Sequence, residues 1–350
     1  MKQEKILTDR QTDRQTDRQT DRQRIDWLDI AKGIGMLLVI YRHCIDDSFD
    51  QLPQLTLMIK SFFMPLFFII SGYLYKLKPT KDYLYSKAKA LLIPLVFVYI
   101  YNFYTGVLSG GLGVDHAYIK LGGYWFIEAL LYITVLYHFL NVFLLNVKFI
   151  KTEFVNYIMF AFSVLVSAVA LIYCYLYGGN PSINSAAVAL GFFSFGHIYR
   201  SIEKTVGKKF KSNRIAYLIV GICCLSITFL VSQNLKDLSM AYNKCSNPVL
   251  YIICAVLGTL GTIYLSKAIN TSKALCFFGR NTLVMLLTQM GIINILRLGI
   301  EYISQNVFGI SESVKVIIIF IGTSFIEVFV VIFFNRVFPI FTGKPRFEQK

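Results

Sequence analysis

The chain has 350 residues, of which 55% are hydrophobic and 16% are charged, and its mean hydropathy is +0.57. Soluble domains are about 45–50% apolar and about a quarter charged, so this composition excludes an ordinary soluble protein. The formal net charge is +15, which on a soluble protein would suggest nucleic acid. On a membrane protein the placement of the charges matters more, and we expect a lipid bilayer and no nucleic acid as partner.

The N-terminal segment 8–23 repeats the four residues TDRQ and contains no apolar residue, so it cannot pack a core. It is not a signal peptide, because no apolar stretch follows within it. The tetranucleotide CAGA, read every twelve bases, also encodes this Gln-Thr-Asp-Arg cycle, so the repeat has a genetic as well as a structural interpretation. We expect residues 1–24 to form a disordered cytoplasmic tail.

Apolar runs begin after Arg24, and a membrane span needs about 20 mostly apolar residues. The sequence therefore predicts an all-α polytopic membrane protein with about ten transmembrane helices. Residues 25–340 would form the transmembrane domain, and residues 341–350 a short cytoplasmic tail. The predicted spans are 27–45, 55–75, 90–109, 124–146, 154–176, 183–199, 214–232, 248–267, 274–294 and 313–335.

The distribution of Lys and Arg tests this arrangement. If the N-terminus is inside, the inner segments hold most of the 35 basic residues, and they include 76–89 and 200–214. The outer loops then hold a handful. This is the positive-inside pattern, and it favours an even number of spans with both termini in the cytoplasm.

The seven cysteines show neither CxxC nor CxH spacing, and most lie inside apolar runs, where Cys behaves as a small hydrophobe. We therefore predict no metal site and no disulfide framework. Cys44 and Cys245 could face the same outer compartment, but we do not expect them to be bonded.

Polar residues within the first span mark a candidate site, because charge inside a membrane is costly. Lys32 and His43 are eleven residues apart and fall within about 20° of each other around a helix. Asp29 precedes Lys32 by three residues, a spacing that allows an ion pair. The alternative interpretation is that all three are interfacial, with Lys32 extending to the inner membrane surface. Gly33 and Gly35 would let a neighbouring helix approach closely.

Other spans also contain polar residues. Glu128 lies about a turn inside the fourth span, and Trp125 is a candidate for the interfacial aromatic belt. Arg280 and Asn281 lie near the inner end of the ninth span, where Arg280 could face an anionic ligand or lipid headgroups. His138 and His197 are expected to form hydrogen bonds between helices.

The stretches RIDWLDIAKGIGMLLVIYRHC and SFFMPLFFIISGYLY resemble the membrane acyltransferase-3 family, and in particular its fucose 4-O-acetylase-like branch. Weaker matches are YWFIEALL, the NPVLYIICAVLGTLGTIYLSKAI block, FFGRNTLVML and NRVFPIFTGK. The resemblance runs from about Arg24 to Gly343. The family signature, a basic residue followed after ten residues by His, corresponds here to Lys32 and His43.

The sequence also departs from the family pattern. Many members have Arg at the position of Lys32, which puts in doubt any role that needs a guanidinium. Many have His at the position of Phe63, and any role of that His is absent here. Some carry an Arg-x-x-Arg pair in an inner loop, where this chain offers Lys87 and Lys89.

The resemblance implies transfer of an acetyl group from acetyl-CoA, with no permanently bound cofactor, to a sugar hydroxyl of lipopolysaccharide or another surface polysaccharide. The acceptor would be a glycan or a lipid-linked sugar, and the enzyme would lie in a bacterial inner membrane. His43 would act as general base or acyl carrier, with Lys32 and Asp29 beside it in the catalytic group. The candidate donor- or substrate-binding residues are Lys87, Lys89, Glu128, Trp125, Arg280 and Asn281.

Two other function classes remain open at this stage. A transporter or flippase of a lipid-linked glycan would use the same charges as a substrate path, although the two halves show no obvious internal repeat. A membrane-embedded structural protein would keep its function after replacement of Lys32 and His43.

Overall fold

The computed structural model describes residues 25–45, 50–108, 124–179, 182–207 and 213–338. The expected tails, 1–24 and 341–350, lie outside the described residues. Within the described ranges the regular structure is helical and contains no strand, apart from one isolated bridge between Ser239 and Lys244. The all-α prediction is therefore confirmed.

The helices follow one another along the chain with short connections. They are α2 (Asp26–Cys44), α3 (Pro53–Tyr73), α4 (Thr80–Lys87), the π-helical turn η2 (Ala88–Leu92), α5 (Ile93–Leu108), α6 (Trp125–Asn146), α7 (Thr152–Tyr177), α8 (Ile183–Gly207), α9 (Arg214–Ser232), α10 (Pro248–Ile269), α11 (Lys273–Arg280), α12 (Thr282–Asn306) and α13 (Glu312–Val337).

Among the described residues, 8 helical segments are long and apolar enough to cross a membrane. The first and sixth predicted spans also form helices, α2 with 19 residues and α8 with 25 residues. Both are more polar than the other eight, because α2 carries the charged stripe and α8 ends in a basic segment. The chain is thus a polytopic helical membrane protein, and the count of ten spans stays a prediction.

Two predicted spans have different limits in the structure. The third begins near Thr80, because α4, η2 and α5 form one helical run that includes the Lys-rich segment expected to be a loop. The ninth, expected over 274–294, is divided at Asn281 into α11 and α12, and α12 continues to Asn306. Asn281 has a non-helical backbone (φ −119°, ψ 16°), which separates the two helices.

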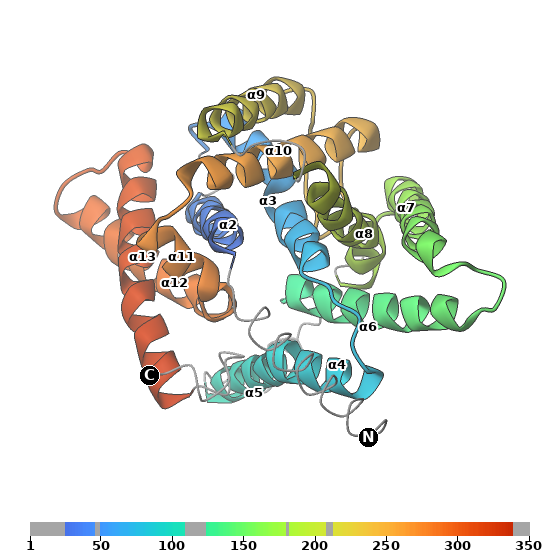
Figure 1. Cartoon of the computed structure of the whole chain (residues 1–350). Helices are drawn as coiled ribbons and strands as arrows, with labels where there is room; N and C mark the ends of the chain where they lie inside the picture. The colour runs from blue at the N-terminus through green and yellow to red at the C-terminus, as the bar shows by residue number, and fades with distance from the viewer. Residues whose placement is uncertain (1–24, 46–49, 109–123, 180–181, 208–212, 339–350) are drawn as a thin grey trace.

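Helices α2 and α3 lie in the interior of the molecule, and the other helices surround them (Figure 1). The backbones of α3 and α8 approach each other closely at two glycines, where no side chain separates them. A Cβ added at Gly72 would lie 1.8 Å from the Phe193 carbonyl oxygen, and one at Gly196 would lie 1.9 Å from that of Ile69. Small residues at such crossings allow close packing in membranes, where water supplies no hydrophobic driving force.

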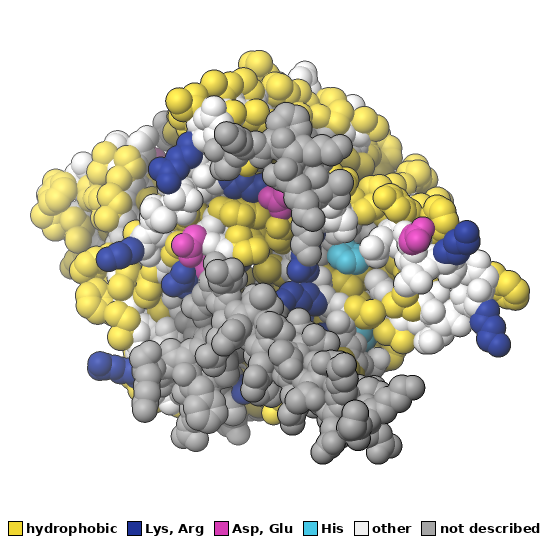
Figure 2. All heavy atoms as spheres, in the orientation of Figure 1, with side chains coloured by type: hydrophobic (Ala, Val, Ile, Leu, Met, Phe, Trp, Pro, Cys, Tyr) yellow, Lys and Arg dark blue, Asp and Glu magenta, His cyan; other side chains and the backbone are white. Residues whose placement is uncertain are grey.

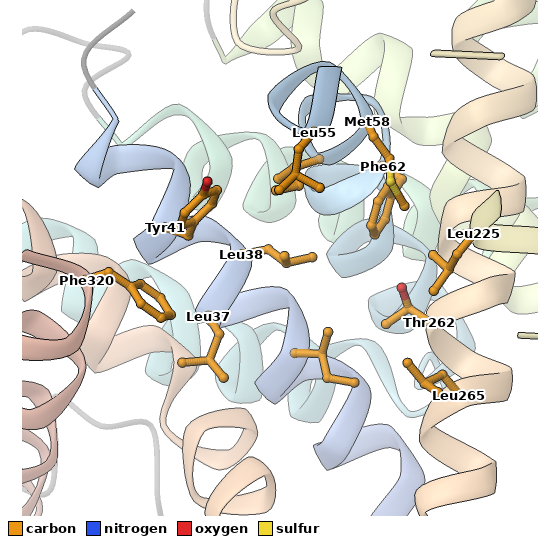
Figure 3. A pocket seen from close by; sticks show the side chains of 12 residues that line it. Leu37, Leu38, Tyr41, Leu55, Met58, Phe62, Leu225, Thr262, Leu265 and Phe320 are labelled. Carbon is orange, nitrogen blue, oxygen red and sulfur yellow. The ribbon is translucent and has the colours of Figure 1, made fainter. Parts of the chain in front are cut away.

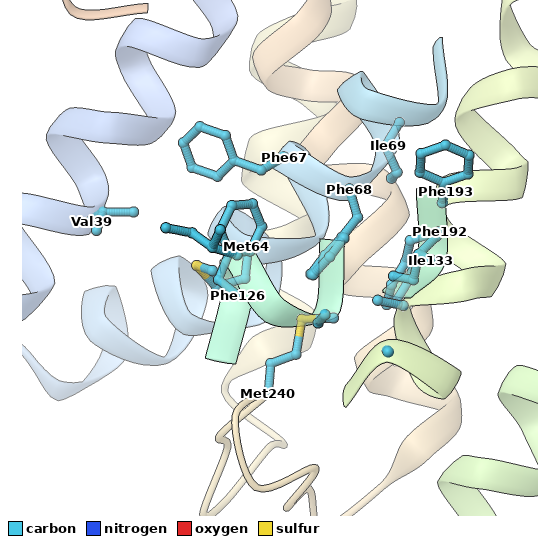
Figure 4. Packing of buried hydrophobic residues seen from close by; sticks show 14 of the residues in the cluster. Val39, Met64, Phe67, Phe68, Ile69, Phe126, Ile133, Phe192, Phe193 and Met240 are labelled. Atoms are coloured by element: carbon cyan, nitrogen blue, oxygen red, sulfur yellow. The ribbon is translucent and has the colours of Figure 1, made fainter. Parts of the chain in front are cut away.

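Aromatic side chains fill the space between α3, α6 and α8. The rings of Phe68 and Phe126 lie 4.9 Å apart between centroids, and Phe193 packs in the same cluster (Figure 4). Such pairs pack well when tilted, because the ring edge of one meets the negative face of the other. This core holds α6 against the central helices.

Large apolar side chains also cover the sides of the molecule, as expected for contact with lipid. Figure 2 shows hydrophobic side chains around the flanks, whereas Lys, Arg, Asp and Glu gather on the face turned to the viewer. Helices α7, α9 and α13 expose many of these apolar groups, for example Leu165, Ile222 and Phe325. A hydrocarbon environment satisfies such surfaces without cost.

Five helix ends that the sequence assigns to the inner side meet at one cluster. Lys267 of α10 forms an ion pair with Glu203 of α8, and its Nζ lies 4.7 Å from the ring centroid of Trp27 in α2 and 5.8 Å from that of Tyr217 in α9. Tyr73 of α3 donates a hydrogen bond to Glu203. The structure thus confirms that these five ends share one side of the molecule. That this side faces the cytoplasm stays a prediction.

Candidate functional site

The polar stripe of α2 has two ends. At its first turns, Lys32 Nζ lies 2.7 Å from Asp29 Oδ1, which confirms the ion pair that the spacing predicts. His43 occupies the last turn of the same helix. Eleven residues at 1.5 Å each place His43 about 16 Å farther along the axis than Lys32. The two signature residues therefore share a helix face but serve opposite ends of it.

Arg280 completes the group at the first turns of α2. Its Nε donates to Asp29 Oδ2 at 2.8 Å, and its NH2 group lies 3.4 Å from Asp26 Oδ1. The side chain of Asp29 is 10% exposed, so this carboxylate is held between two cations in a mostly buried position. The structure thus brings together three of the predicted site residues, Asp29, Lys32 and Arg280. The Arg280 guanidinium is directed at two carboxylates of the protein, those of Asp29 and Asp26. That it also faces an anionic ligand or lipid headgroups stays a prediction.

Two glycines explain why α11 reaches α2. A Cβ added at Gly33 would lie 2.1 Å from the Leu275 carbonyl oxygen, and one at Gly279 would lie 1.8 Å from that of Asp29. Real Cβ contacts are longer, so any side chain at either position would push the helices apart. The close approach predicted at Gly33 is confirmed, and it places Arg280, the next residue after Gly279, against Asp29.

His43 is half-buried at the C-terminal end of the stripe, and its Nδ1 has no hydrogen-bond partner among the described residues. Its carbonyl oxygen accepts a hydrogen bond of 3.0 Å from the NH2 group of Arg297 in α12, which lies 3.4 Å from the Cys44 carbonyl oxygen as well. A cation is favourable at a helix C-terminus, where unpaired carbonyls carry partial negative charge. Arg297 therefore fixes the end of α2 that carries His43.

Sequence reasoning missed Arg297 because the ninth span was expected to end at residue 294. A longer apolar pattern, continuing through Leu298 to Ile303, was the signal that could have placed this arginine inside a helix. Glu327 was missed as well. It is fully buried in α13, where it contacts the hydroxyl of Thr288 at 2.8 Å. An acidic residue within an apolar span was its signal.

Glu128 and Trp125 lie elsewhere in the molecule, at the start of α6. The Glu128 carboxylate is buried and accepts hydrogen bonds from the hydroxyls of Tyr99 and Ser182. Trp125 packs against the hydrophobic core and meets Phe126 edge to face. These contacts are with α5, the start of α8 and the core rather than with α2, and the inclusion of Glu128 and Trp125 in the site stays a prediction.

Asn281 connects helices rather than facing Lys32. Its side-chain amide donates to the Phe277 carbonyl at 2.7 Å, and Asn335 of α13 donates to its oxygen at 3.2 Å. These bonds hold the break between α11 and α12 against α13. A role of Asn281 in binding a substrate stays a prediction, whereas its role in ending α11 beside Arg280 is visible.

Lys87 and Lys89 do not lie in a loop, contrary to expectation. Lys87 ends α4 and Lys89 lies in η2, because the helical run begins at Thr80 directly after Pro79. Proline at the start of a helix costs no hydrogen bond, since the first N–H groups are unpaired anyway. Lys87 Nζ lies 5.3 Å from the Tyr83 ring centroid. The described contacts include no ion pair that links either lysine to the Asp29 group.

The two other membrane histidines form the predicted bonds between helices, His197 of α8 with Tyr137 of α6 and His138 of α6 with Thr80 of α4. Both also lie beside tyrosine hydroxyls. His138 Nδ1 lies 3.3 Å from the Tyr75 hydroxyl, and His197 Nδ1 lies 2.8 Å from that of Tyr137. The described part of the chain contains no group of three or more His, Cys, Asp or Glu side chains that could hold a metal ion.

A pocket of about 390 Å³ lies on the opposite side of α2 from this stripe. Tyr41, one of the residues that line it, is about 180° around the helix from Lys32. Figure 3 shows Leu38 of α2 and Phe62 of α3 at this pocket, and its lining is almost wholly apolar. It is therefore separate from the charged group at Asp29.

The fold and this stripe define a polytopic membrane protein with a charged, partly buried site on an interior helix. A family model described as an acyltransferase domain matches residues 25–334, and the chain belongs to this acyltransferase-3 family. It is therefore a membrane acyltransferase. Neither the curated proteins nor the solved structures contain a match to the chain.

Proposed function

We propose that this acyltransferase moves an acetyl group from acetyl-CoA to a sugar hydroxyl of a cell-surface glycan, such as lipopolysaccharide or another polysaccharide, in a bacterial inner membrane. The observation that carries the proposal is the pair of Lys32 and His43 on one face of α2. The sequence resemblance to glycan O-acetylases supports the choice of donor and acceptor, and the fucose 4-O-acetylase-like branch is part of this proposal.

His43 is the reactive group in this proposal because its Nδ1 is buried and has no hydrogen-bond partner among the described residues. As a general base, the imidazole takes the proton of the sugar hydroxyl while that oxygen attacks the acetyl carbonyl and the CoA thiolate leaves. As an acyl carrier, its nitrogen first attacks the acetyl carbonyl and releases the thiolate. The sugar oxygen then attacks the acetyl-imidazole. In both routes the thiolate finally takes up one proton.

The two ends of α2 suit the two substrates. Acetyl-CoA is anionic and cytoplasmic, so we place it at the end that holds Lys32, near the basic inner segments. The glycan then meets the acetyl group at the end that holds His43. The distance of about 16 Å between these residues requires the thioester arm of the donor to extend along α2, with its phosphates outside the membrane core.

Labelled acetyl-CoA tests this function directly. Purified protein in lipid vesicles should transfer label from [acetyl-¹⁴C]acetyl-CoA to a surface polysaccharide extract, and mild base should release it as acetate, as expected of an ester. The matched control is the Lys32→Ala, His43→Ala double variant. Movement of a lipid-linked glycan across the vesicle without transfer of label would instead indicate a flippase. Transfer of label that survives the double replacement would assign the chemistry to residues other than Lys32 and His43.

We further propose that the TDRQ repeat in residues 8–23 makes expression phase-variable. A pure CAGA tract would change the reading frame when one unit is gained or lost, which suits a modifier of an exposed surface glycan. Sequencing the gene tests this: mixed codons for the four residues, without a CAGA tract, would rule it out.

A further inference from the structure

The short helix α11 ends on the carboxylate that holds Lys32. Arg280 Nε binds Asp29 Oδ2 at 2.8 Å, while Lys32 Nζ binds Asp29 Oδ1 at 2.7 Å. One carboxylate thus divides its charge between two cations. We propose that Arg280 is a positioning residue, which occupies one oxygen of Asp29 and so leaves a net positive charge on the group that faces the acyl donor. This inference rests on the proposed use of acetyl-CoA.

Charge arithmetic supports this role. Lys32, Asp29 and Arg280 together carry a net charge of about +1, whereas Lys32 and Asp29 alone carry none. Asp26 adds less, because its side chain is 50% exposed and lies 3.4 Å from Arg280, so water screens it. An anionic donor is therefore attracted to the group with Arg280 and much less to the group without it.

The position of α11 against α2 also places Arg280 on Asp29. The Gly33 and Gly279 contacts fix its backbone against α2 within a distance that no side chain would allow. The planar guanidinium then reaches Asp29 with Nε and Asp26 with NH2 in a forked geometry. A donor-binding arginine would be expected to present this fork to the ligand, whereas here the fork is directed at carboxylates of the protein.

Arg280→Gln and the double variant Arg280→Gln, Asp29→Asn separate positioning from packing. We expect Arg280→Gln to raise the KM for acetyl-CoA about tenfold with a smaller change in kcat, because Asp29 then neutralises Lys32. The double variant restores a net charge of about +1 and keeps Oδ1 as a partner for Lys32, so its KM should return toward the wild-type value. A structural role predicts no such rescue, since both variants lack the Arg280–Asp29 ion pair.

Gly279→Ala provides an independent test of the seating of α11, with Gly299→Ala as its control, because a Cβ at Gly299 in α12 meets nothing within 4 Å. We expect Gly279→Ala, but not the control, to raise the KM for acetyl-CoA. If Arg280→Gln does not yield folded protein, Arg280→Lys takes its place. It keeps the charge, so its KM should stay within about threefold of wild type.

An unchanged KM in Arg280→Gln, or no recovery in the double variant, would overturn the positioning role. So would a tenfold rise in Arg280→Lys. Failure of the wild-type protein to use acetyl-CoA would instead overturn the proposed function, and the wild-type reaction in the same assay distinguishes the two results.

Discussion

At the scale of single residues, the proposed chemistry depends on the contrast between the two ends of α2. Lys32 is bound by a carboxylate that also binds Arg280, whereas His43 Nδ1 has no partner among the described residues. A group that must bind an anion benefits from a fixed position and a defined charge. A group that must exchange a proton or an acyl group needs a nitrogen that no hydrogen bond within the protein occupies.

Replacement of His43 tests the reactive group. His43→Ala should lower the rate of acetyl transfer by about 10²–10⁴-fold, the usual cost of removing a general base. His43→Gln keeps a similar polar shape but cannot titrate or carry an acetyl group, so it should fail equally. Both rates are measured with labelled acetyl-CoA in vesicles that contain equal amounts of protein.

Cys44→Ala is the matched control, because Cys44 is adjacent in sequence and lies on another face of α2. Its rate should stay within about twofold of wild type. Near-normal transfer by a well-expressed His43→Ala protein would remove His43 from the mechanism.

At the scale of elements, backbone contacts between helices position the site. Gly33 and Gly279 join α11 to α2, and Gly72 and Gly196 join α3 to α8. At each position the nearest atom to an added Cβ is a carbonyl oxygen, which cannot move away as the tip of a flexible side chain can. The crossings are therefore sensitive to a single methyl group.

Gly196→Ala should destabilise the α3–α8 crossing. The added Cβ would lie 1.9 Å from the Ile69 carbonyl oxygen, so the helices must separate, at a cost of about 1–3 kcal/mol. Thermal unfolding in detergent measures this loss. Gly291→Ala is the control, because a Cβ there meets nothing within 4 Å. Equal unfolding temperatures for the two variants would contradict the prediction.

At the scale of the whole molecule, helix ends from distant parts of the sequence contact one another on the same side of the helical bundle. The Lys267 cluster joins the ends of α2, α3, α8, α9 and α10 on one side. On the other side, Gln233 of the α9 end donates to the Gln54 carbonyl at the start of α3. The alternation of spans inferred from the basic residues is thus visible in the contacts, while the orientation in the membrane depends on an experiment.

Cysteine labelling determines this orientation. A cysteine at Lys81, at the start of α4, should react with a membrane-impermeant maleimide only after the cytoplasmic side is opened. A cysteine at Lys244, which is exposed in the connection between α9 and α10, should react in intact spheroplasts. The control is a protein without its native cysteines. Reaction of the Lys81 position from outside would reverse the proposed topology and would place the donor on the other side.

The sequence by itself determined the helical membrane class, the approximate spans, the Asp29–Lys32 pair and the shared face of Lys32 and His43. Each of these depends on composition or on spacing within one helix, where the geometry is regular. The tertiary structure alone decided that Arg280 binds Asp29 and that Arg297 binds the end of α2. These facts depend on how separate helices approach each other. The position of a neighbouring backbone is set by packing, and local sequence does not encode it.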